Sequence, residues 1–393
     1  LYPFGTGPVQ RFATTLIMGL LTSLFTAIFI SRMIFIYLLD KNKTITFDTK
    51  ITRNFLANTN INFLNMRKTA YTISIVLVVI SLASLTFRGL NYGVDFTGGR
   101  TYLVRFDQDV TVNEVRDALA IEFTDAVPEV KTFGPNRQVK ITTKYMIENE
   151  GREVDSLIQS MLFRGLEQFY QTDINYNDFT SDQEAEDKLI GILSSQKVGP
   201  TIADDIRNKA VTAVILSLLI IFGYIAIRFR KWQYGLAGII ALAHDTIIVL
   251  GVFSIFYNIL PFSMEVDQSF IAAILTIIGY SINDTVIIFD RIRENVTLHP
   301  KKLLRININD GLNSTLMRTF NTSGTTALVL IIIAIFGGEV IRGFVFALLI
   351  GILVGTYSSV FNASPMVFDL LKGPKQEKEA AEKEAANPRN KKK

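Results

Sequence analysis

Hydrophobic residues gather into seven separate apolar stretches, each close to the roughly 20 residues that cross a bilayer as a helix. The stretches occupy residues 12–38, 68–88, 209–229, 235–257, 268–290, 320–338 and 340–371. Soluble domains rarely contain several such runs, so the pattern predicts an α-helical membrane protein with about seven transmembrane helices. The last stretch is long enough to tilt or to extend beyond the bilayer.

The pattern changes between the second and third stretches, where residues 100–198 alternate over short distances. The predicted elements are a strand at 101–107, a helix at 112–123, strands at 130–133 and 138–142, a helix at 154–170 and a strand at 189–198. The order β-α-β-β-α-β is that of the ferredoxin-like split unit. We therefore expect one extracytoplasmic α+β ferredoxin-like domain.

Positive charges set the expected orientation, because cytoplasmic loops are rich in Lys and Arg. They gather in segments 39–67, 228–234 and 291–319 and in the tail, all on one side of a seven-span protein. The net charge of +4 is small and gives no indication of nucleic acid binding. The absence of cysteine excludes disulfides and thiolate metal sites.

This topology predicts a division of the chain into six parts. They are a first transmembrane helix at 1–38, a cytoplasmic linker at 39–67, a second transmembrane helix at 68–88, an outer domain with connectors at 89–208, a five-helix bundle at 209–371 and a charged cytoplasmic tail at 372–393. The sequence begins at Leu1 without a methionine or a signal peptide, so we expect a preceding segment.

A weak internal repeat relates the first and last stretches, because residues 11–29 align with 343–361 without gaps. The identical pairs are Phe12/Phe344, Leu16/Leu348, Gly19/Gly351, Leu21/Leu353 and Phe29/Phe361. Chance is one explanation, since membrane helices use few residue types. The other is that the first stretch ends an earlier, related half of a duplicated transporter.

An acid, Asp284, lies inside the fifth apolar stretch, where a charge costs about 2.5–3.5 kcal/mol on insertion scales. Thr276 and Tyr280 precede it at intervals of four residues, and Gly279 and Asn283 lie beside them. The polar stripe is explained by helix packing for Thr276 and Tyr280. For Asp284 we expect a titrating or ion-binding group that faces a protein interior.

Two further charged residues are candidates for the same chemistry. Arg318 stands at the inner end of the sixth stretch, where it either reaches the interface or pairs with Asp284 at a similar depth. Asp245 follows His244 near the middle of the fourth stretch, and adjacent residues are expected to face different sides of a helix. Asp245 is either a structural partner or a second relay group. Since His299 is the only other histidine, metal-dependent hydrolysis is not expected.

Two glycine motifs flank the outer domain. Segment 93–99 reads Gly-Val-Asp-Phe-Thr-Gly-Gly and lacks the lysine of a phosphate loop. Gly199-Pro200 indicates a break between strand and helix. The residues of this predicted hinge or structural motif are Gly93, Asp95, Gly98, Gly99, Gly199 and Pro200.

These motifs together resemble the SecF family over about residues 65–372. The resemblance is carried by segments 93–99, 198–202, 243–245, 281–295 and 318–323. The first stretch, with the preceding Gly5-Thr-Gly-Pro8, looks like the last transmembrane helix of SecD. The chain thus resembles the C-terminal part of a fused SecDF protein, joined by the basic linker.

The resemblance implies an RND-type accessory subunit of the Sec translocase in the bacterial cytoplasmic (inner) membrane. It implies a motor, not a hydrolytic enzyme, that uses the proton-motive force in late steps of protein export. The implied proton relay is Asp284 and Arg318, to which Asp245 is added from the sequence. No cofactor is expected beyond the proton gradient, although Na⁺ is an alternative coupling ion.

The implied partners are a SecD-like half fused upstream, the SecYEG channel, SecA, YajC, the translocating preprotein and membrane lipid. A second acid on the SecD-like half is expected to face Asp284. Two other classes of function compete with this one. A scaffold is disfavoured by the intramembrane charges, and an exporter of small molecules is disfavoured by the single modest outer domain.

The predicted topology can be tested with single introduced cysteines, because the chain has none. Cysteines introduced within residues 100–198 or at Glu339 should react with an impermeant thiol reagent added outside intact cells. Cysteines introduced at Lys50 or in the tail should react only after permeabilisation. Labelling of a cysteine at Lys50 from outside would contradict the seven-span topology.

Overall fold

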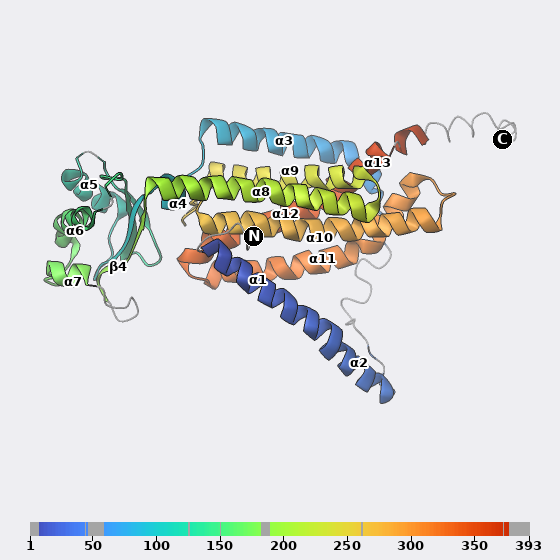
Figure 1. Ribbon diagram of the computed structural model, residues 1–393, viewed down its shortest axis with the longest axis horizontal. Helices are drawn as coiled ribbons and strands as arrows, with labels where there is room; N and C mark the ends of the chain where they lie inside the picture. Colours follow the sequence, from blue (N-terminus) through green and yellow to red (C-terminus); the bar gives the residue numbers. More distant parts are fainter. Residues whose placement is uncertain are drawn as a thin grey trace.

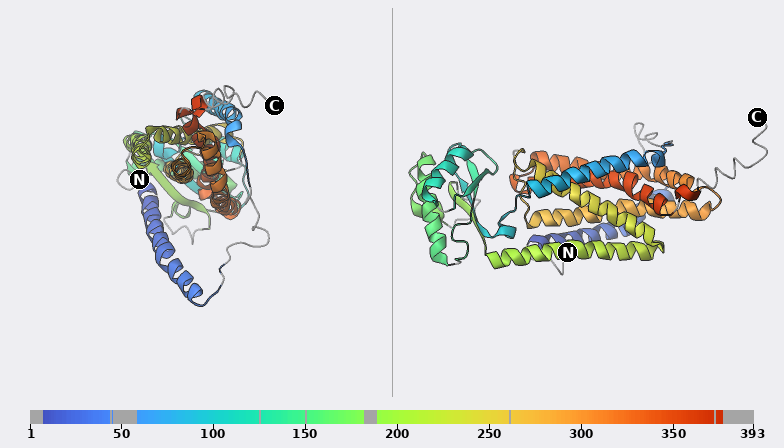
Figure 2. Two further views of the ribbon diagram at one scale, coloured as in Figure 1. Left: turned by 90° about the vertical axis from the view of Figure 1, so that its right-hand side faces the viewer. Right: turned by 90° about the horizontal axis from the view of Figure 1, so that it is seen from above.

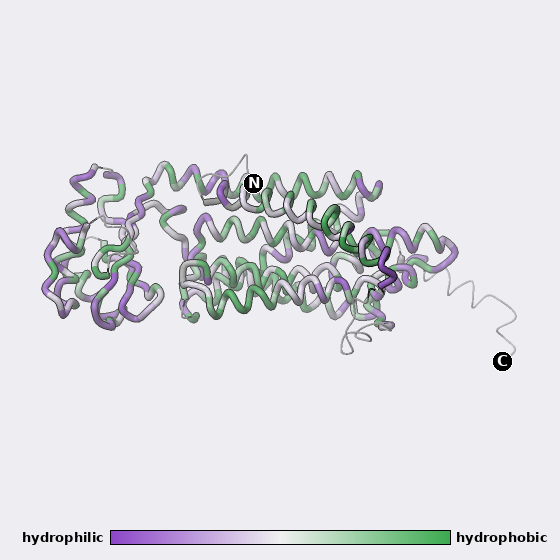
Figure 3. Tube along the Cα trace, turned by 90° about the horizontal axis from the view of Figure 1, so that it is seen from below, coloured by the Kyte–Doolittle hydropathy of each residue, from purple (hydrophilic) through white to green (hydrophobic). Residues whose placement is uncertain are grey.

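The computed structural model describes residues 8–43, 45, 59–124, 126–149, 151–181, 189–260, 262–371 and 373–376. Long helices form a bundle, and a small domain with a sheet lies at one end of it (Figure 1). Within the described residues, seven helices are long and apolar enough to cross a membrane. Hydrophobic residues run along these helices between two more polar ends (Figure 3). The predicted multi-span architecture is confirmed.

The spans are longer than the apolar stretches that predicted them. The first is α1 (Pro8–Phe25), η1 (Thr26–Ile30) and α2 (Ser31–Asp40), and the others are α3 (Arg67–Phe87), α8 (Pro200–Phe229), α9 (Trp232–Phe256), α10 (Gln268–Leu298), α11 (Leu304–Phe336) and the continuous α12 (Glu339–Ser358), η4 (Ser359–Ala363) and α13 (Ser364–Leu370). α11 begins 16 residues before the predicted sixth stretch, because its first turns are polar and lie beyond the apolar run. Arg318 therefore lies inside a helix and not at its end.

α10 is the central helix of the bundle, because 56% of its most apolar 18-residue stretch is buried. The first span lies at the other extreme, because only 6% of its most apolar stretch is buried. It diverges from the other helices toward the inner end (Figures 1 and 2). The other described residues therefore leave its apolar side chains almost entirely uncovered.

The outer domain is built on a four-stranded antiparallel sheet in the order β2-β3-β1-β4. Its elements are α4 (Val94–Thr97), β1 (Gly99–Arg105), α5 (Val112–Glu122), β2 (Glu129–Thr132), β3 (Gln138–Thr143), α6 (Arg152–Leu166), η3 (Glu167–Phe169), α7 (Tyr176–Thr180) and β4 (Gly191–Val198). Val104 of β1 and Phe106, the residue after this strand, are fully buried with Leu119 of α5 and Leu162 of α6. The two longer helices thus cover one sheet face, as the ferredoxin-like prediction requires.

The end of the predicted linker packs against the inner end of the bundle. Phe63 and Leu64, in the short helix η2 (Phe63–Asn65), are buried. On α11, the side chain of Asn313 accepts a hydrogen bond from Ile61 N and donates one to Ile61 O, both at 2.9 Å. Residues 46–58 of the linker and 377–393 of the tail lie outside the described residues.

Candidate functional site

Asp284 lies on α10 and is 4% exposed. Its Oδ2 accepts a hydrogen bond from Ser323 Oγ of α11 at 3.1 Å. Ser323 Oγ in turn accepts one from Thr356 Oγ1 of α12 at 2.7 Å. A chain of hydroxyl groups therefore connects the intramembrane acid to two neighbouring helices.

Arg318 is exposed on α11, and within the described residues it forms no ion pair with Asp284. It precedes Ser323 by five positions, or about 7.5 Å of helix. Ser323 is level with Asp284 and is the partner of the acid in this structure. Arg318 lies farther toward the inner end of α11 by that distance.

The polar stripe on α10 divides into an inward and an outward part. Thr276 bonds to the carbonyl oxygen of Ala272 in its own helix, and Tyr280 Oη donates to Thr326 Oγ1 of α11 at 3.3 Å. These contacts fit the predicted packing role. Gly279 and Asn283 are exposed instead, so an amide group faces outward one position from the buried acid.

Asp245 on α9 is 1% exposed and lies at the centre of a second polar cluster. Its Oδ2 accepts hydrogen bonds from Ser281 Oγ of α10 at 2.7 Å and Ser358 Oγ of α12 at 2.8 Å. Its Oδ1 lies 3.0 Å from Nδ1 of His244. As predicted, the two side chains have different neighbours, because Asp245 turns toward α10 and α12 and His244 toward α3 and Asn362. The Nδ1 atom of His244 nevertheless reaches Asp245.

The two clusters share α10 and α12, which approach closely at Gly355. A Cβ atom there would lie 2.9 Å from Ser281 Oγ and 3.4 Å from Asp245 Oδ2. Small residues allow such contacts between membrane helices. The π-helical segment η4 follows immediately and carries Ser359, whose hydroxyl lies 2.7 Å from that of Thr285. π-Segments within α-helices are frequent at functional sites.

Sequence reasoning missed the serines and threonines of these clusters. Single hydroxyl residues in apolar helices commonly bond to their own backbone, so they carried no signal individually. A usable signal was their spacing: Ser281 and Thr285 flank Asp284 on neighbouring turns of one helix, and the adjacent pair Ser358-Ser359 lies in the aligned repeat.

The outer glycine motif is bonded directly to the first residue of α10. Asp95 Oδ2 accepts a hydrogen bond from Gln268 N at 3.1 Å, and Oδ1 accepts from the side-chain amides of Gln268 at 3.2 Å and of Gln196 in β4 at 3.1 Å. A carboxylate at this place satisfies free N–H groups and interacts favourably with the helix dipole. Asp95 therefore ties the outer domain to the helix that carries Asp284.

The glycines of this motif are required by geometry. Gly98 has φ +70° and Gly99 has φ +131°. Residues with a side chain rarely adopt such positive φ angles, whereas glycine does so readily. A Cβ at Gly99 would lie 2.9 Å from Thr143 O, and one at Gly98 would lie 3.4 Å from Pro200. Gly199 is extended and Pro200 begins α8. The predicted hinge residues form one closely packed joint.

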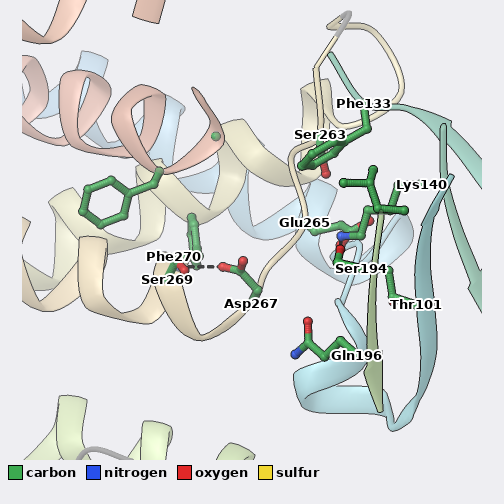
Figure 4. Close-up of a pocket in the computed structure, with 13 residues that line it drawn as sticks. Thr101, Phe133, Lys140, Ser194, Gln196, Ser263, Glu265, Asp267, Ser269 and Phe270 are labelled. Atoms are coloured by element: carbon green, nitrogen blue, oxygen red, sulfur yellow. Dashed lines mark hydrogen bonds and ion pairs between the residues drawn. The ribbon is translucent and has the colours of Figure 1, made fainter. Parts of the chain in front are cut away.

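Glu265, in the loop before α10, holds the sheet against the bundle. Its carboxylate pairs with Lys140 of β3 at 2.5 Å and Lys131 of β2 at 3.3 Å. Burial opposes ionisation, but the two lysines outweigh it and hold the pKa of Glu265 below its usual range. A cavity of about 300 Å³ separates the helix-free sheet face from this loop (Figure 4).

Asp267 caps the N-terminus of α10 by accepting a hydrogen bond from Phe270 N at 2.8 Å (Figure 4). Burial raises the pKa of Asp267 to about 6, and the nearby charge of Asp95 acts in the same direction. The bond from Phe270 opposes this shift without cancelling it. The joint thus contains an acid that titrates at a mildly acidic pH.

Comparison with known proteins decides the family. A family model described as "Protein export membrane protein SecD/SecF, C-terminal" matches residues 179–373, and one described as "SecD/SecF GG Motif" matches residues 83–110. "Protein translocase subunit SecF" of Rhodothermus marinus is 42% identical over 313 residues, which cover 80% of this chain and 94% of that protein. The chain belongs to the SecF family.

A second SecF relative, from Vibrio alginolyticus, is 35% identical over 83% of this SecF-family chain and 96% of its own length. The crystal structure of SecDF from Thermus thermophilus has a TM-score of 0.77 and 31% identity, and the match covers 95% of this chain. The chain spans 46% of that SecDF, or about half. This SecF-family chain is a multi-pass protein of the bacterial inner membrane.

The raised pKa of Asp267 gives a stability prediction. The folded state holds this proton more tightly than the unfolded state, so the contribution of Asp267 is fully present below about pH 4 and is lost as the pH rises to about 6. The loss amounts to at most about 3 kcal/mol. Asp267→Asn keeps a capping side chain and removes the titration.

The measurement is thermal unfolding of the two proteins in lipid nanodiscs across this pH range. The variant should gain stability relative to the wild type as the pH rises from about 4 to about 6. Contributions from Glu265 run in the opposite direction but are common to both proteins. Asp109→Asn, at an exposed position in the outer domain, is the control. Parallel stability curves for the wild type and Asp267→Asn would contradict the prediction.

Proposed function

We propose that this SecF-family chain is an accessory subunit of the Sec translocase that uses the proton-motive force in late steps of protein export across the inner membrane. The observation that carries the proposal is that the buried acid Asp284 lies on α10, whose outer end is bonded to the outer domain. A proton that binds to Asp284 or leaves it can therefore move a domain outside the membrane.

Asp284 has two alternative partners in this proposal. In its neutral form it bonds to Ser323, the contact present in this structure. In its ionised form it requires a positive charge, because an unpaired carboxylate in the membrane interior is costly. Arg318 supplies that charge after its side chain and α11 shift by less than two helical turns. One proton that crosses about 100 mV provides about 2.3 kcal/mol, enough to favour one of two such packings.

Two connections transmit a shift of α10 to the outer domain. The first is direct, through Asp95 and Glu265. The second runs through the inner end, where Arg293 of α10 donates a hydrogen bond to the carbonyl oxygen of Arg228 at 3.0 Å and Asp290 pairs with the Arg228 side chain at 3.3 Å. Arg228 is in the last turn of α8, which runs outward to Pro200 and leads into β4.

The proposal includes a SecD-like half, of which the first span is the last transmembrane helix. Two observations support it. The π-segments η1 and η4 lie one residue apart in the ungapped alignment of the first and last spans, and π-helices are rare. The first span is largely uncovered, and so is the polar face that contains Asn283 and Arg318 at membrane depth. A second set of helices would cover both and supply the second acid.

The remaining partners follow from the family and belong to the proposal as well. They are the SecYEG channel, SecA, YajC and the exported preprotein. Na⁺ is the alternative to the proton as coupling ion. It would have to bind the oxygen atoms of Asp284, Ser323 and Thr356, which lie together in one cluster. Export that follows an imposed Na⁺ gradient at constant pH would favour Na⁺.

Asp284→Asn tests the proton role, because the amide has nearly the volume of the acid and cannot ionise. We expect normal insertion and folding but loss of the potential-dependent part of export, measured in vesicles that contain the chain and a SecD-like half. Arg318→Lys keeps the charge without the planar fork, so partial loss is expected. Asp310→Asn, which changes an inner-surface acid paired with Lys302, is the control. Wild-type potential dependence in Asp284→Asn would refute the proton role and favour a scaffold.

A single cysteine that replaces Asn283 tests whether a SecD-like half covers the polar face on which this residue lies. A membrane-soluble thiol reagent should label this cysteine when the chain is produced alone and should label it much less when a SecD-like half is present. A cysteine at Ile80 of α3, which is 50% exposed, should react in both cases. α3 lies on the other side of the bundle from the first span (Figure 1). Equal labelling at position 283 with and without that half would show that the SecD-like half does not cover this face.

A further inference from the structure

His244 connects the buried Asp245 to a second group of polar side chains. Nε2 of His244 lies 3.4 Å from Nδ2 of Asn362 in η4. Asn362 exchanges hydrogen bonds with Ser74 of α3 at 2.8 and 3.1 Å. Within the described residues, His244 is the only basic side chain paired with Asp245. A carboxylate–imidazole pair therefore lies in the membrane interior, isolated from other ion pairs.

A groove of about 590 Å³ between α3, α9 and α13 leads to this pair from the inner side of the bundle. Most of its lining is aliphatic, but Asp369, Tyr71, Ser74, Asn362 and His244 also line it. At the inner end, Tyr71 Oη donates a hydrogen bond to Asp369 Oδ2 at 3.0 Å, and the Asp369 side chain is 35% exposed. Two hydrogen-bonded pairs, Tyr71–Asp369 and Ser74–Asn362, thus lie along an otherwise aliphatic groove between the inner surface and the imidazole.

Three hydrogen-bond donors converge on Asp245. Two serine hydroxyls and the Nδ1–H of His244 are directed at its two oxygens, so the carboxylate is bound as a hydrogen-bond acceptor. The negative charge is balanced when the imidazole carries a second proton on Nε2. Asn362 can serve both forms of the ring, since its amide presents a donor to a neutral Nε2 and, when turned, an oxygen to a protonated one.

We propose that the His244–Asp245 pair is a second proton-binding site, which exchanges protons with the inner side of the membrane through this groove. A hydronium ion in the groove transfers its proton to Nε2 and leaves water behind, while Nδ1–H remains on Asp245. Release reverses the same step. The inference rests on the proposed function only for the use made of the proton, because the binding itself can be measured without export.

The pair is placed to act on Asp284 through shared helices. Ser281, which binds Asp245, lies one turn from Asp284 on α10, and Ser358 lies two residues from Thr356 on α12. Loss of the imidazole proton leaves the negative charge of Asp245 without a positive partner. The hydrogen bonds from both serines to Asp245 then become stronger. The contact between α10 and α12, on which the Ser323–Asp284 bond depends, therefore responds to the state of His244.

Other titratable or charged groups near the ring come from three elements. They are Tyr71 and Arg67 on α3, Asp369 on α13 and Tyr357 on α12. Arg67 pairs with Asp369 at 3.4 Å, so the inner mouth carries a balanced ion pair. Tyr357 donates to the carbonyl oxygen of Ala70 at 3.1 Å. None of these groups lies between His244 and Asp245, so the ring is the proton acceptor nearest the buried carboxylate.

The test uses the fact that the chain has only two histidines. The full chain is labelled with ¹⁵N-histidine and reconstituted in bilayers with a SecD-like half. Ring ¹⁵N signals are then recorded from about pH 5 to about pH 8, the range in which histidines titrate. His299→Gln removes the exposed histidine and leaves the signal of His244 alone. We expect Nε2 of His244 to gain and lose a proton in this range while Nδ1 stays protonated.

Two variants separate proton binding from structure. Asp245→Asn keeps the shape and a hydrogen-bonding oxygen but removes the charge, so His244 should remain neutral over the whole range. His244→Gln should insert normally and lose the dependence of export on the inner pH, whereas His299→Gln should keep it. A His244 ring that stays in one protonation state in the wild type, or full dependence on inner pH in His244→Gln, would overturn the inference.

The outcomes also separate this site from the proposed function. A titrating His244 together with an active, potential-dependent Asp284→Asn variant would refute the proposed role of Asp284 and leave the second site standing. A silent His244 together with an inactive Asp284→Asn variant would overturn only the second site.

Discussion

The structure depends on one constraint: a carboxylate inside a membrane must have partners, because the lipid supplies none. Asp245 and Asp284 obtain theirs from hydroxyl groups on neighbouring helices. α12 adds Ser358, which also bonds to Asp245, and passes close to α10 at Gly355 before it continues as the π-segment η4. The packing of the central helices is therefore organised around two acids, and a change in the charge of either one changes the most favourable packing.

Carboxylates also form the joint between the bundle and the outer domain. Asp95 attaches the outer domain to the bundle by accepting a hydrogen bond from the first residue of α10. Glu265 and its two lysines add an ion pair that is largely shielded from solvent. Such an arrangement holds the outer domain to α10 more firmly than a free glycine turn would. The positive φ angles of Gly98 and Gly99 belong to this joint, where β1 and the start of α8 pack closely together.

The bundle is also uneven in its coverage. α9 and α10 are well buried, whereas the first span is exposed over nearly its whole length. Beside it, Asn283 and Arg318 present polar groups at the depth of the hydrocarbon. Exposed polar groups are as unfavourable there as buried unpaired ones. The same constraint that orders the interior therefore indicates which face of the bundle another set of helices would cover.

The sequence by itself determined the elements: apolar length predicted the spans, alternation predicted the sheet domain, and an acid in an apolar run indicated a candidate site. Each of these signals is local to one segment. The partners were decided by the tertiary structure, which bonded Asp284 to Ser323, brought His244 onto Asp245 and made Asp95 the cap of α10. Periodicity specifies which residues share a face of their own helix, but which neighbouring side chain meets that face depends on the rotation and crossing of several helices at once.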